Sequence, residues 1–288
     1  MSAQGEIIVC VKPRAVRRTT AARAVSLPLR RPILSDADAV AVEEALRARE
    51  RGEAHRVICV SAGALAAHDA LIETLAMGAD RVLRIDVHHD AALEAVATAS
   101  LLAAAILAFG ATLVLTAQRS DDGRSGLVPA FLARALGAAY LSNAVAMRLT
   151  PGEVEIQRRL GHGDRQIWSA AFPAVVAFDA GINLPRYPRA RVRILARRRP
   201  IEELSPAALG VSLDSLPRST VVVRLTPARV RPKKTALPAA GQSAAERLRA
   251  ILSGGLNGKK GGRILKGPVE QLTAETLSFL NERHLLDD

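Results

Sequence analysis

The stretch RVICVSAGALAAHDALIETLAMGADRVLRIDV, residues 56–87, holds two apolar runs with a helix-length segment between them. The runs at 56–63 and 81–87 are short and rich in β-branched residues, as buried strands are. The segment 64–78 is closed by Gly78, which is a common helix end. Two parallel strands need a helical crossover of this kind. The stretch therefore predicts a strand–helix–strand unit.

The same alternation continues on both sides of this unit. We predict further strands and helices at 6–12, 36–53, about 91–109, 112–117 and 125–137. Because the strands are continuous apolar runs, the pattern predicts an α/β fold with a mostly parallel sheet and helices on both faces. Ligands of such sheets bind at the carboxyl ends of the strands. A site is therefore expected in the loops after Lys12, Ser61 and Thr116.

The pattern changes after residue 141. Residues 143–179 are interpreted as hairpins, with turns at Pro151–Gly152 and at 161–164. A last strand is predicted at 221–225 and two tail helices at 243–253 and about 270–283. The expected organisation is a nucleotide-binding domain over 1–226, a linker rich in proline and basic residues over 227–242, and a helical tail over 243–288.

The composition limits the class of protein. The chain has 288 residues and a formal net charge of +12, which implies an acidic partner of some kind. Cys10 and Cys59 lie in apolar runs, so a disulfide framework is not expected. We expect the protein to be located in a reducing bacterial cytoplasm. The uncharged stretch 95–118 is long enough for a bilayer, but Gly110 divides it into a helix and a strand, so no membrane span is expected.

The loop QRSDDGRSGLVP, residues 118–129, follows a predicted strand and opens a predicted helix. Small residues there free backbone N–H groups to bind an anion at a helix N-terminus. The alternative is an ordinary strand-to-helix turn with an Asp or Ser cap. His88, His89 and Asp90 lack an evident third metal ligand, and no nucleophile–base set stands out. We therefore predict no metal site and no catalytic residue.

The stretch INLPRYPRARVRILARRRP, residues 182–200, contains seven arginines. Arginine clusters can bind phosphates, which raises nucleic acid as a partner. Readers of RNA usually add aromatic stacking, and only Tyr187 lies nearby. Nucleic acid is therefore not the expected partner.

Six collinear segments resemble the electron transfer flavoprotein beta subunit family. They are DADAVAVEEALRARERGE (36–53), LAMGADRVLRI (75–85), AQRSDDGRSGLVPAFLARALG (117–137), FPAVVAFDAGINLPRY (172–187), RILARRRPIEEL (193–204) and ALGVSL (208–213). The resemblance covers about residues 6–215. It implies a Rossmann-like sheet, similar to that of the adenine nucleotide alpha hydrolases, and an electron carrier rather than an enzyme.

The resemblance also implies cofactors and partners. The redox FAD would be held mainly by an alpha subunit in a heterodimer, and the beta subunit would hold AMP in a structural role. A second FAD replaces AMP in electron-bifurcating relatives. The expected partners are a flavin dehydrogenase as electron donor and a quinone reductase or another acceptor. The alternative is a stand-alone adenine-nucleotide-binding module of the same fold class.

The family's cofactor contacts map onto this chain with departures. Leu127 and Val128 replace polar residues of the family pattern, and Pro129 replaces a glycine and lacks an N–H group. Arg124 could supply a replacement donor. The candidate cofactor-binding residues are Cys10, Ser35, Asp38, Ala62, Gln118, Asp121, Asp122, Arg124, Ser125, Gly126, Leu127 and Val128.

The arginine-rich stretch aligns with the family's recognition loop, which docks the partner dehydrogenase. The family often places an anchoring leucine where this chain has Ala190. We therefore expect a docking loop over 184–195 that meets an acidic partner face through charge. The candidate docking residues are Pro185, Arg186, Tyr187, Arg189, Ala190 and Arg191.

Overall fold

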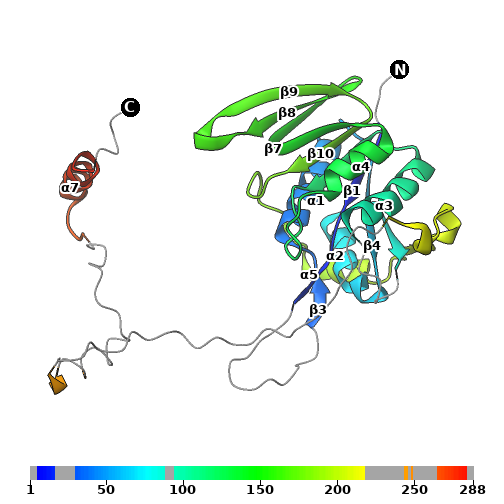
Figure 1. The fold of residues 1–288 in the computed structure, drawn as a ribbon, viewed down its shortest axis with the longest axis horizontal. Coiled ribbons are helices and arrows are strands. Elements are labelled where there is room, and N and C mark those ends of the chain that lie inside the picture. Colours follow the sequence, from blue (N-terminus) through cyan, green and yellow to red (C-terminus); the bar gives the residue numbers. More distant parts are fainter. Residues whose placement is uncertain are drawn as a thin grey trace. The chain divides into compact units, whose positions relative to one another are not determined.

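The protein is represented by a computed structural model, which describes residues 5–16, 30–87, 94–217, 243–245, 248 and 265–283. The chain divides into two units, Met1–Leu225 and Thr226–Asp288. The first unit holds the sheet and the helices that cover it (Figure 1). The second unit contains α7 (Val269–Asn281), which agrees with the helix predicted at about 270–283.

A nine-stranded sheet forms the centre of the first unit, in the order β11-β5-β4-β1-β6-β10-β7-β8-β9. The strands are β1 (Glu6–Cys10), β4 (Arg56–Gly63), β5 (Arg81–Asp86), β6 (Leu113–Ala117), β7 (Ala139–Thr150), β8 (Glu153–Arg159), β9 (Arg165–Ala171), β10 (Ala174–Phe178) and β11 (Glu202–Leu204). All neighbours pair in parallel except β7 with β8 and β8 with β9. A two-stranded sheet, β2 (Arg14–Val16) with β3 (Arg30–Ile33), is separate.

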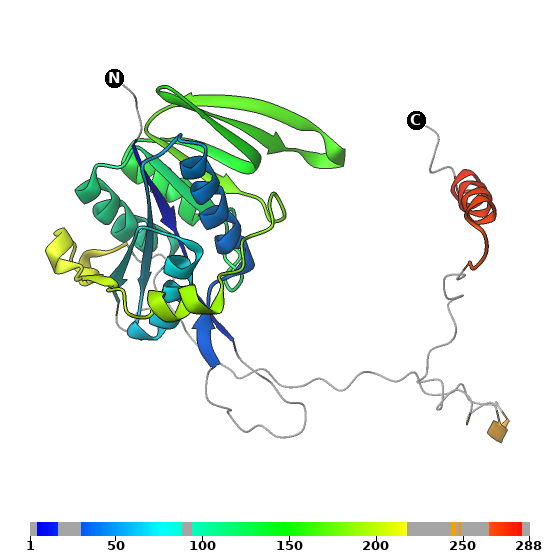
Figure 2. The same cartoon turned by 180° about the vertical axis from the view of Figure 1, so that it is seen from behind.

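Helices cover both faces of the parallel part, as Figures 1 and 2 show. One core cluster joins α1 (Asp36–Glu50), α2 (His68–Met77) and α5 (Ala190–Ala196) to one set of strand residues, among them Ile7, Val9 and Leu115. A second cluster joins α3 (Ala95–Phe109) and α4 (Val128–Leu136) to the alternate set, such as Ile8 and Val114. Because adjacent residues of a strand face opposite sides, continuous apolar runs bury both faces. The predicted α/β fold is confirmed.

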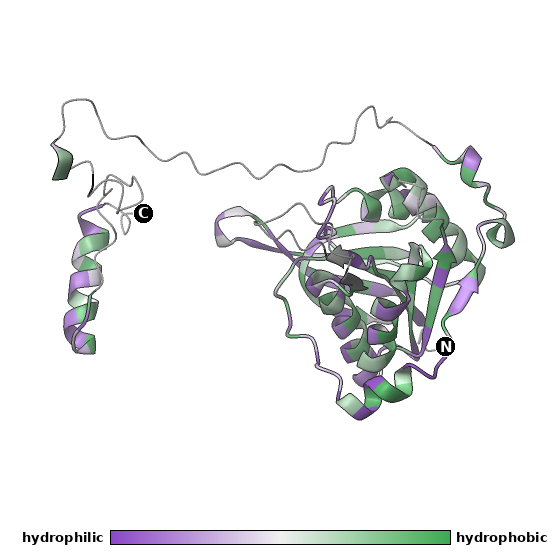
Figure 3. Ribbon diagram, turned by 90° about the horizontal axis from the view of Figure 1, so that it is seen from below, coloured by the Kyte–Doolittle hydropathy of each residue, from purple (hydrophilic) through white to green (hydrophobic). Residues whose placement is uncertain are grey.

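Hydrophobic residues follow the central strands, and hydrophilic residues are concentrated toward the periphery (Figure 3). Within the described residues, no helix is long and apolar enough to cross a membrane. The uncharged stretch 95–118 becomes α3 and β6, and Gly110 ends α3 in a left-handed conformation with φ +66°. A side chain would be strained at that φ, so the glycine suits the break between helix and strand.

Several local predictions need correction. Residues 174–178, expected within the hairpins, form β10, which pairs in parallel between β6 and β7. Its buried apolar run carries no sign of its pairing direction, so the sequence did not place it. The hairpin turns at 151–152 and 161–164 do join β7, β8 and β9. The predicted helix 125–137 begins at Val128, and residues 65–67 form a short 3₁₀ turn before α2.

The expected loop over 184–195 is also partly helical, because α5 begins at Ala190. Its buried Ala196 packs in the cluster of α1 and α2, and this contact holds the short helix against the domain. The strand predicted at 221–225 lies outside the described residues. So does most of the helix predicted at 243–253.

Candidate functional site

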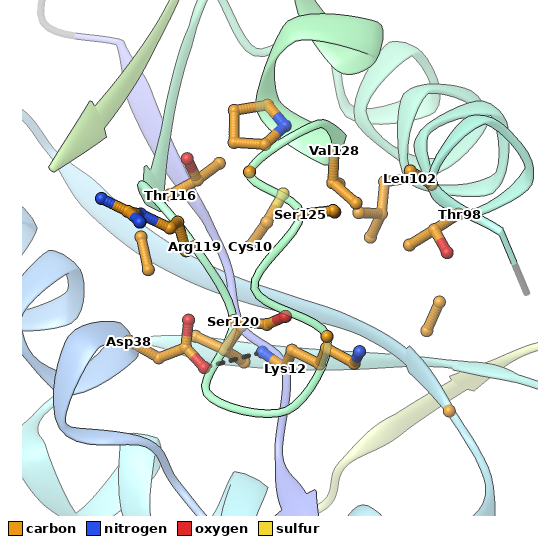
Figure 4. A pocket seen from close by; sticks show the side chains of 18 of the residues that line it. Cys10, Lys12, Asp38, Thr98, Leu102, Thr116, Arg119, Ser120, Ser125 and Val128 are labelled. Atoms are coloured by element: carbon orange, nitrogen blue, oxygen red, sulfur yellow. Dashed lines mark hydrogen bonds between the residues drawn. The ribbon is translucent and has the colours of Figure 1, made fainter. Parts of the chain in front are cut away.

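A cavity of about 480 Å³ opens at the carboxyl ends of β1, β4 and β6. This is the edge where parallel α/β sheets bind ligands, and the volume lies within the usual range of small-molecule sites. The lining residues come from the strand ends, α1, α3, and the loop between β6 and α4 (Figure 4). They are Cys10, Val11, Lys12, Asp38, Ala62, Gly63, Ala64, Val87, Ala95, Thr98, Leu102, Thr116, Ala117, Gln118, Arg119, Ser120, Gly123, Ser125, Gly126, Val128 and Pro129.

Cys10 and Thr116 form one wall of the cavity. They are Cα partners in neighbouring parallel strands, so their side chains project from the same face of the sheet. Burial raises the pKa of the Cys10 thiol, which keeps it neutral and poorly nucleophilic. Thr116 is 4% exposed, and its hydroxyl has no hydrogen-bond partner among the described protein groups. A buried hydroxyl of this kind is satisfied when a polar ligand binds beside it.

Asp38 enters the cavity from the first turn of α1. The helix is capped by Ser35, whose Oγ accepts from the Asp38 N–H at 3.0 Å. Asp38 Oδ2 accepts from the backbone N–H of Lys12 at 2.9 Å. Burial nevertheless raises the pKa of Asp38 to about 7, against the opposing effect of these hydrogen bonds. Ser35 is buried beneath Asp38 and does not line the cavity.

The loop between β6 and α4 is held from two sides. The amide of Gln118 donates from Nε2 to the Tyr140 hydroxyl at 3.2 Å and accepts from the Asn143 N–H at 2.8 Å, so it is engaged with β7. Gly126 has φ +66°, and a Cβ there would meet the Gln118 carbonyl oxygen at 3.3 Å. Only a glycine combines that conformation with that close approach, so Gly126 allows the tight turn of this loop.

Acidic residues of the same loop are engaged by cations of the N-terminal segment. Lys12 Nζ lies 2.8 Å from Asp122 Oδ1, and Arg14 Nε lies 3.3 Å from Asp121 Oδ2. Neither aspartate lines the cavity, and neither do Arg124 or Leu127, which are exposed. These four candidate residues therefore border the site, and the two aspartates tie its loop to the end of β1.

Thus, the structure brings together Cys10, Asp38, Ala62, Gln118, Ser125, Gly126 and Val128 from the candidate set. It adds Lys12, Thr98, Thr116 and Arg119, which were not selected from the sequence. Thr116 offered a signal, because it is a polar residue near the end of an apolar strand. Arg119 offered none, because a loop arginine is ordinarily a solvated charge. Among the described residues, no cluster of three or more His, Cys, Asp or Glu could hold a metal ion.

The candidate docking residues lie on the face that carries α5. Arg186 is bound internally, with its guanidinium between Glu43 at 2.8 Å and Glu50 at 2.6 Å. Tyr187 is 81% exposed, and the Arg193 guanidinium lies 4.6 Å from its ring centroid. Arg193 is itself paired with Glu73 of α2. Pro185 precedes this ion-paired group and is half-buried.

Other arginines of the stretch are exposed and have no ion pair among the described residues, namely Arg189, Arg191, Arg197 and Arg198. Ala190 lies in the first turn of α5 and is exposed. Ile194 and Leu195 are exposed apolar residues of the same helix. The candidate docking face therefore carries apolar side chains together with arginines that have no ion pair among the described residues.

These features define a Rossmann-like α/β protein with a ligand-sized cavity at the carboxyl edge of its parallel sheet. The family model described as the electron transfer flavoprotein domain matches residues 30–209. The electron transfer flavoprotein subunit beta of Syntrophomonas wolfei is 32% identical over 61% of this chain and 69% of its own length. That of Mycobacterium leprae is 29% identical over 71% and 78%. A probable subunit beta of Schizosaccharomyces pombe is 29% identical over 61% and 69%.

The chain belongs to the electron transfer flavoprotein family, and its relatives named above are beta subunits of that family.

Proposed function

We propose that the chain is the beta subunit of a heterodimeric electron transfer flavoprotein. It would carry electrons, together with an alpha subunit, from a flavin dehydrogenase to a quinone reductase or another acceptor. The observation that carries this proposal is the family match over residues 30–209, combined with relatives whose names describe a beta subunit. The redox FAD, bound mainly by the alpha subunit, supplies the electron-carrying flavin, and this chain orients and shields it.

The cavity is proposed to hold AMP in a structural role. An orphaned buried hydroxyl at Thr116 and an uncommitted cation at Arg119 fit a ligand that has both polar and anionic groups. Leu102, Val87 and Val128 provide an apolar part of the lining for a base. Pro129 has no N–H to offer and the Gly123 N–H already donates to Asp122, so backbone donors would come from Ser125 and Gly126.

Docking of the dehydrogenase is proposed at the face of α5. The free arginines Arg189 and Arg191 flank Ala190, which is too small to anchor an interface by itself. Ile194 and Leu195 provide apolar contact area on the same helix. Positive charge around this patch favours a partner with an acidic docking face, and such charges mainly raise the rate of encounter.

Co-purification with the alpha-like partner tests the proposal. The expected product is a yellow heterodimer from which one flavin and one AMP per dimer are released and quantified. Two flavins and no AMP would replace AMP with a second FAD, as in bifurcating relatives. A colourless, stable monomer or homodimer that binds adenine nucleotide would overturn the heterodimer proposal in favour of a stand-alone nucleotide-binding module.

A further inference from the structure

Two cationic side chains line the cavity, Lys12 and Arg119. The ammonium group of Lys12 already has an internal partner, because its Nζ lies 2.8 Å from Asp122 Oδ1. Arg119 has neither an ion pair nor a side-chain hydrogen bond within the part of the chain that the structure describes. It is therefore the lining cation that remains free for an incoming anion.

The two ends of the cavity differ in polarity (Figure 4). Arg119 and Asp38 lie at one side, and Thr98, Leu102 and Val128 lie at the other. A ligand with an apolar base and a phosphate would place its phosphate at the polar side. The carboxyl group of Asp38 lies at the same side, so a phosphate there requires a compensating positive charge. Lys12 already pairs with Asp122, whereas Arg119 has no ion pair among the described residues and can provide that charge.

The loop that carries Arg119 is built for a close approach. Gly126 lies against both the Gln118 carbonyl oxygen and the Arg119 side chain, whose Cγ would be 3.4 Å from an added Cβ. Arg124 lies on the same loop and is exposed, as Arg119 is, but it lies outside the cavity lining. Its backbone has φ +51°, at the turn of the loop. The two arginines are therefore matched in charge and segment and differ in their access to the cavity.

We propose that Arg119 is the specificity-determining residue for the phosphate of the nucleotide bound in this cavity. Its planar guanidinium can form two parallel hydrogen bonds to phosphate oxygens. It thereby takes the role of the polar side chains of the family pattern, which Leu127 and Val128 replace in this chain. This inference rests on the proposed nucleotide site and adds the residue that distinguishes a nucleotide from a nucleoside.

Calorimetric titration of the full-length chain, freed of nucleotide, tests the inference with AMP and adenosine as paired probes. Arg119→Ala should weaken AMP binding about ten- to hundredfold, the value of a charged hydrogen bond, and leave adenosine binding within about twofold. Arg119→Lys should recover part of the AMP affinity, since it restores the charge without the planar fork. Arg124→Ala is the matched control and should bind both probes as the unaltered chain does.

Equal AMP binding by Arg119→Ala and the unaltered chain would overturn this inference and leave the nucleotide site standing. An equal loss of AMP and adenosine would overturn it as well, because the residue would then act on the shape of the cavity. A loss confined to Arg124→Ala would transfer the role to that residue. If the unaltered chain binds neither probe, the proposed nucleotide site fails and the inference fails with it.

Discussion

Two buried carboxylates of α1 have pKa values that are shifted in opposite directions. Asp38, beside the cavity, and Glu43, beside the candidate docking face, are each 3% exposed. Burial raises the pKa of Asp38 to about 7. Burial acts on Glu43 in the same direction, but hydrogen bonds from Arg186 and Arg47 outweigh it and lower its pKa. Two guanidinium groups bind Glu43, whereas the Asp38 carboxylate accepts from the backbone N–H of Lys12. Asp38 also lies deeper among protein atoms, so desolvation prevails there.

Internal ion pairs also distinguish the charged residues within two segments of the chain. In the loop between β6 and α4, the acidic residues Asp121 and Asp122 have internal ion pairs, and Arg119 has none among the described residues. In the stretch 182–200, Arg186 and Arg193 are neutralised by glutamates of α1 and α2, while other arginines stay exposed. The charges to which we propose a function are therefore those without an internal partner among the described residues.

The largest expected effect concerns Asp38. Its folded-state pKa of about 7 lies above the ordinary value of 3.8, so the folded protein holds a proton that the unfolded chain releases. The free energy of unfolding should therefore fall as the pH rises from about 4 to about 7, by an amount on the order of a few kcal/mol. Asp38→Asn should remove this slope, as urea unfolding across the pH range would show. An unchanged slope would mean that Asp38 is not the source.

Glu43 should respond with the opposite sign. Its lowered pKa stabilises the fold above the ordinary pKa of a glutamate, and this contribution is lost as the pH falls. Arg186→Ala leaves Glu43 buried with fewer donors and should lower the free energy of unfolding by about 2–3 kcal/mol at neutral pH. Arg198→Ala, at an exposed position of the same stretch, is the control and should change it by less than about 0.5 kcal/mol. An equal loss of unfolding free energy in both variants would refute the distinction between internally paired and exposed arginines.

The free arginines should act on the partner instead of on stability. Reversing Arg189 and Arg191 together to glutamate should slow electron transfer from the dehydrogenase about tenfold at low salt and flatten its salt dependence. Stopped-flow reduction of the flavin at two ionic strengths measures both effects. Turnover that is unchanged at low salt would exclude this face as the dock.

The smallest effect is expected at the ion pair between Lys12 and Asp122. Both side chains are about half exposed, at 55% and 50%, so solvent screens their attraction. Lys12→Ala should lower the free energy of unfolding by less than about 1 kcal/mol. A larger loss would show that this pair holds the cavity loop in place more strongly than an exposed ion pair can.

The sequence predicted the features that depend on local patterns. The apolar runs and the crossover helix of 56–87 became β4, α2 and β5 with both faces buried. The alternation was sufficient for the α/β fold, and the position of the site loops followed from the rule for carboxyl ends of strands. The six collinear segments were sufficient to identify the family.

The sequence failed where long-range contacts decide. It placed β10 in a hairpin, although that strand pairs between β6 and β7, far from its chain neighbours. It selected Asp122 as a cofactor contact without showing that this carboxylate pairs with Lys12 and lies outside the cavity lining, and the selection stays a prediction. It passed over Thr116 and Arg119, because an orphaned hydroxyl or an unpaired guanidinium is defined only by the atoms around it.

Composition and periodicity determined the layers, the strand–helix order and the abundance of positive charge in this protein. Tertiary structure alone decided which of those charges form ion pairs within the fold. Arg186 and Arg189 are three residues apart and chemically identical, yet one lies against Glu43 and Glu50 and the other is exposed. The physical reason is that an ion pair depends on distance and solvation in space, and neither is encoded in the spacing of residues along the chain.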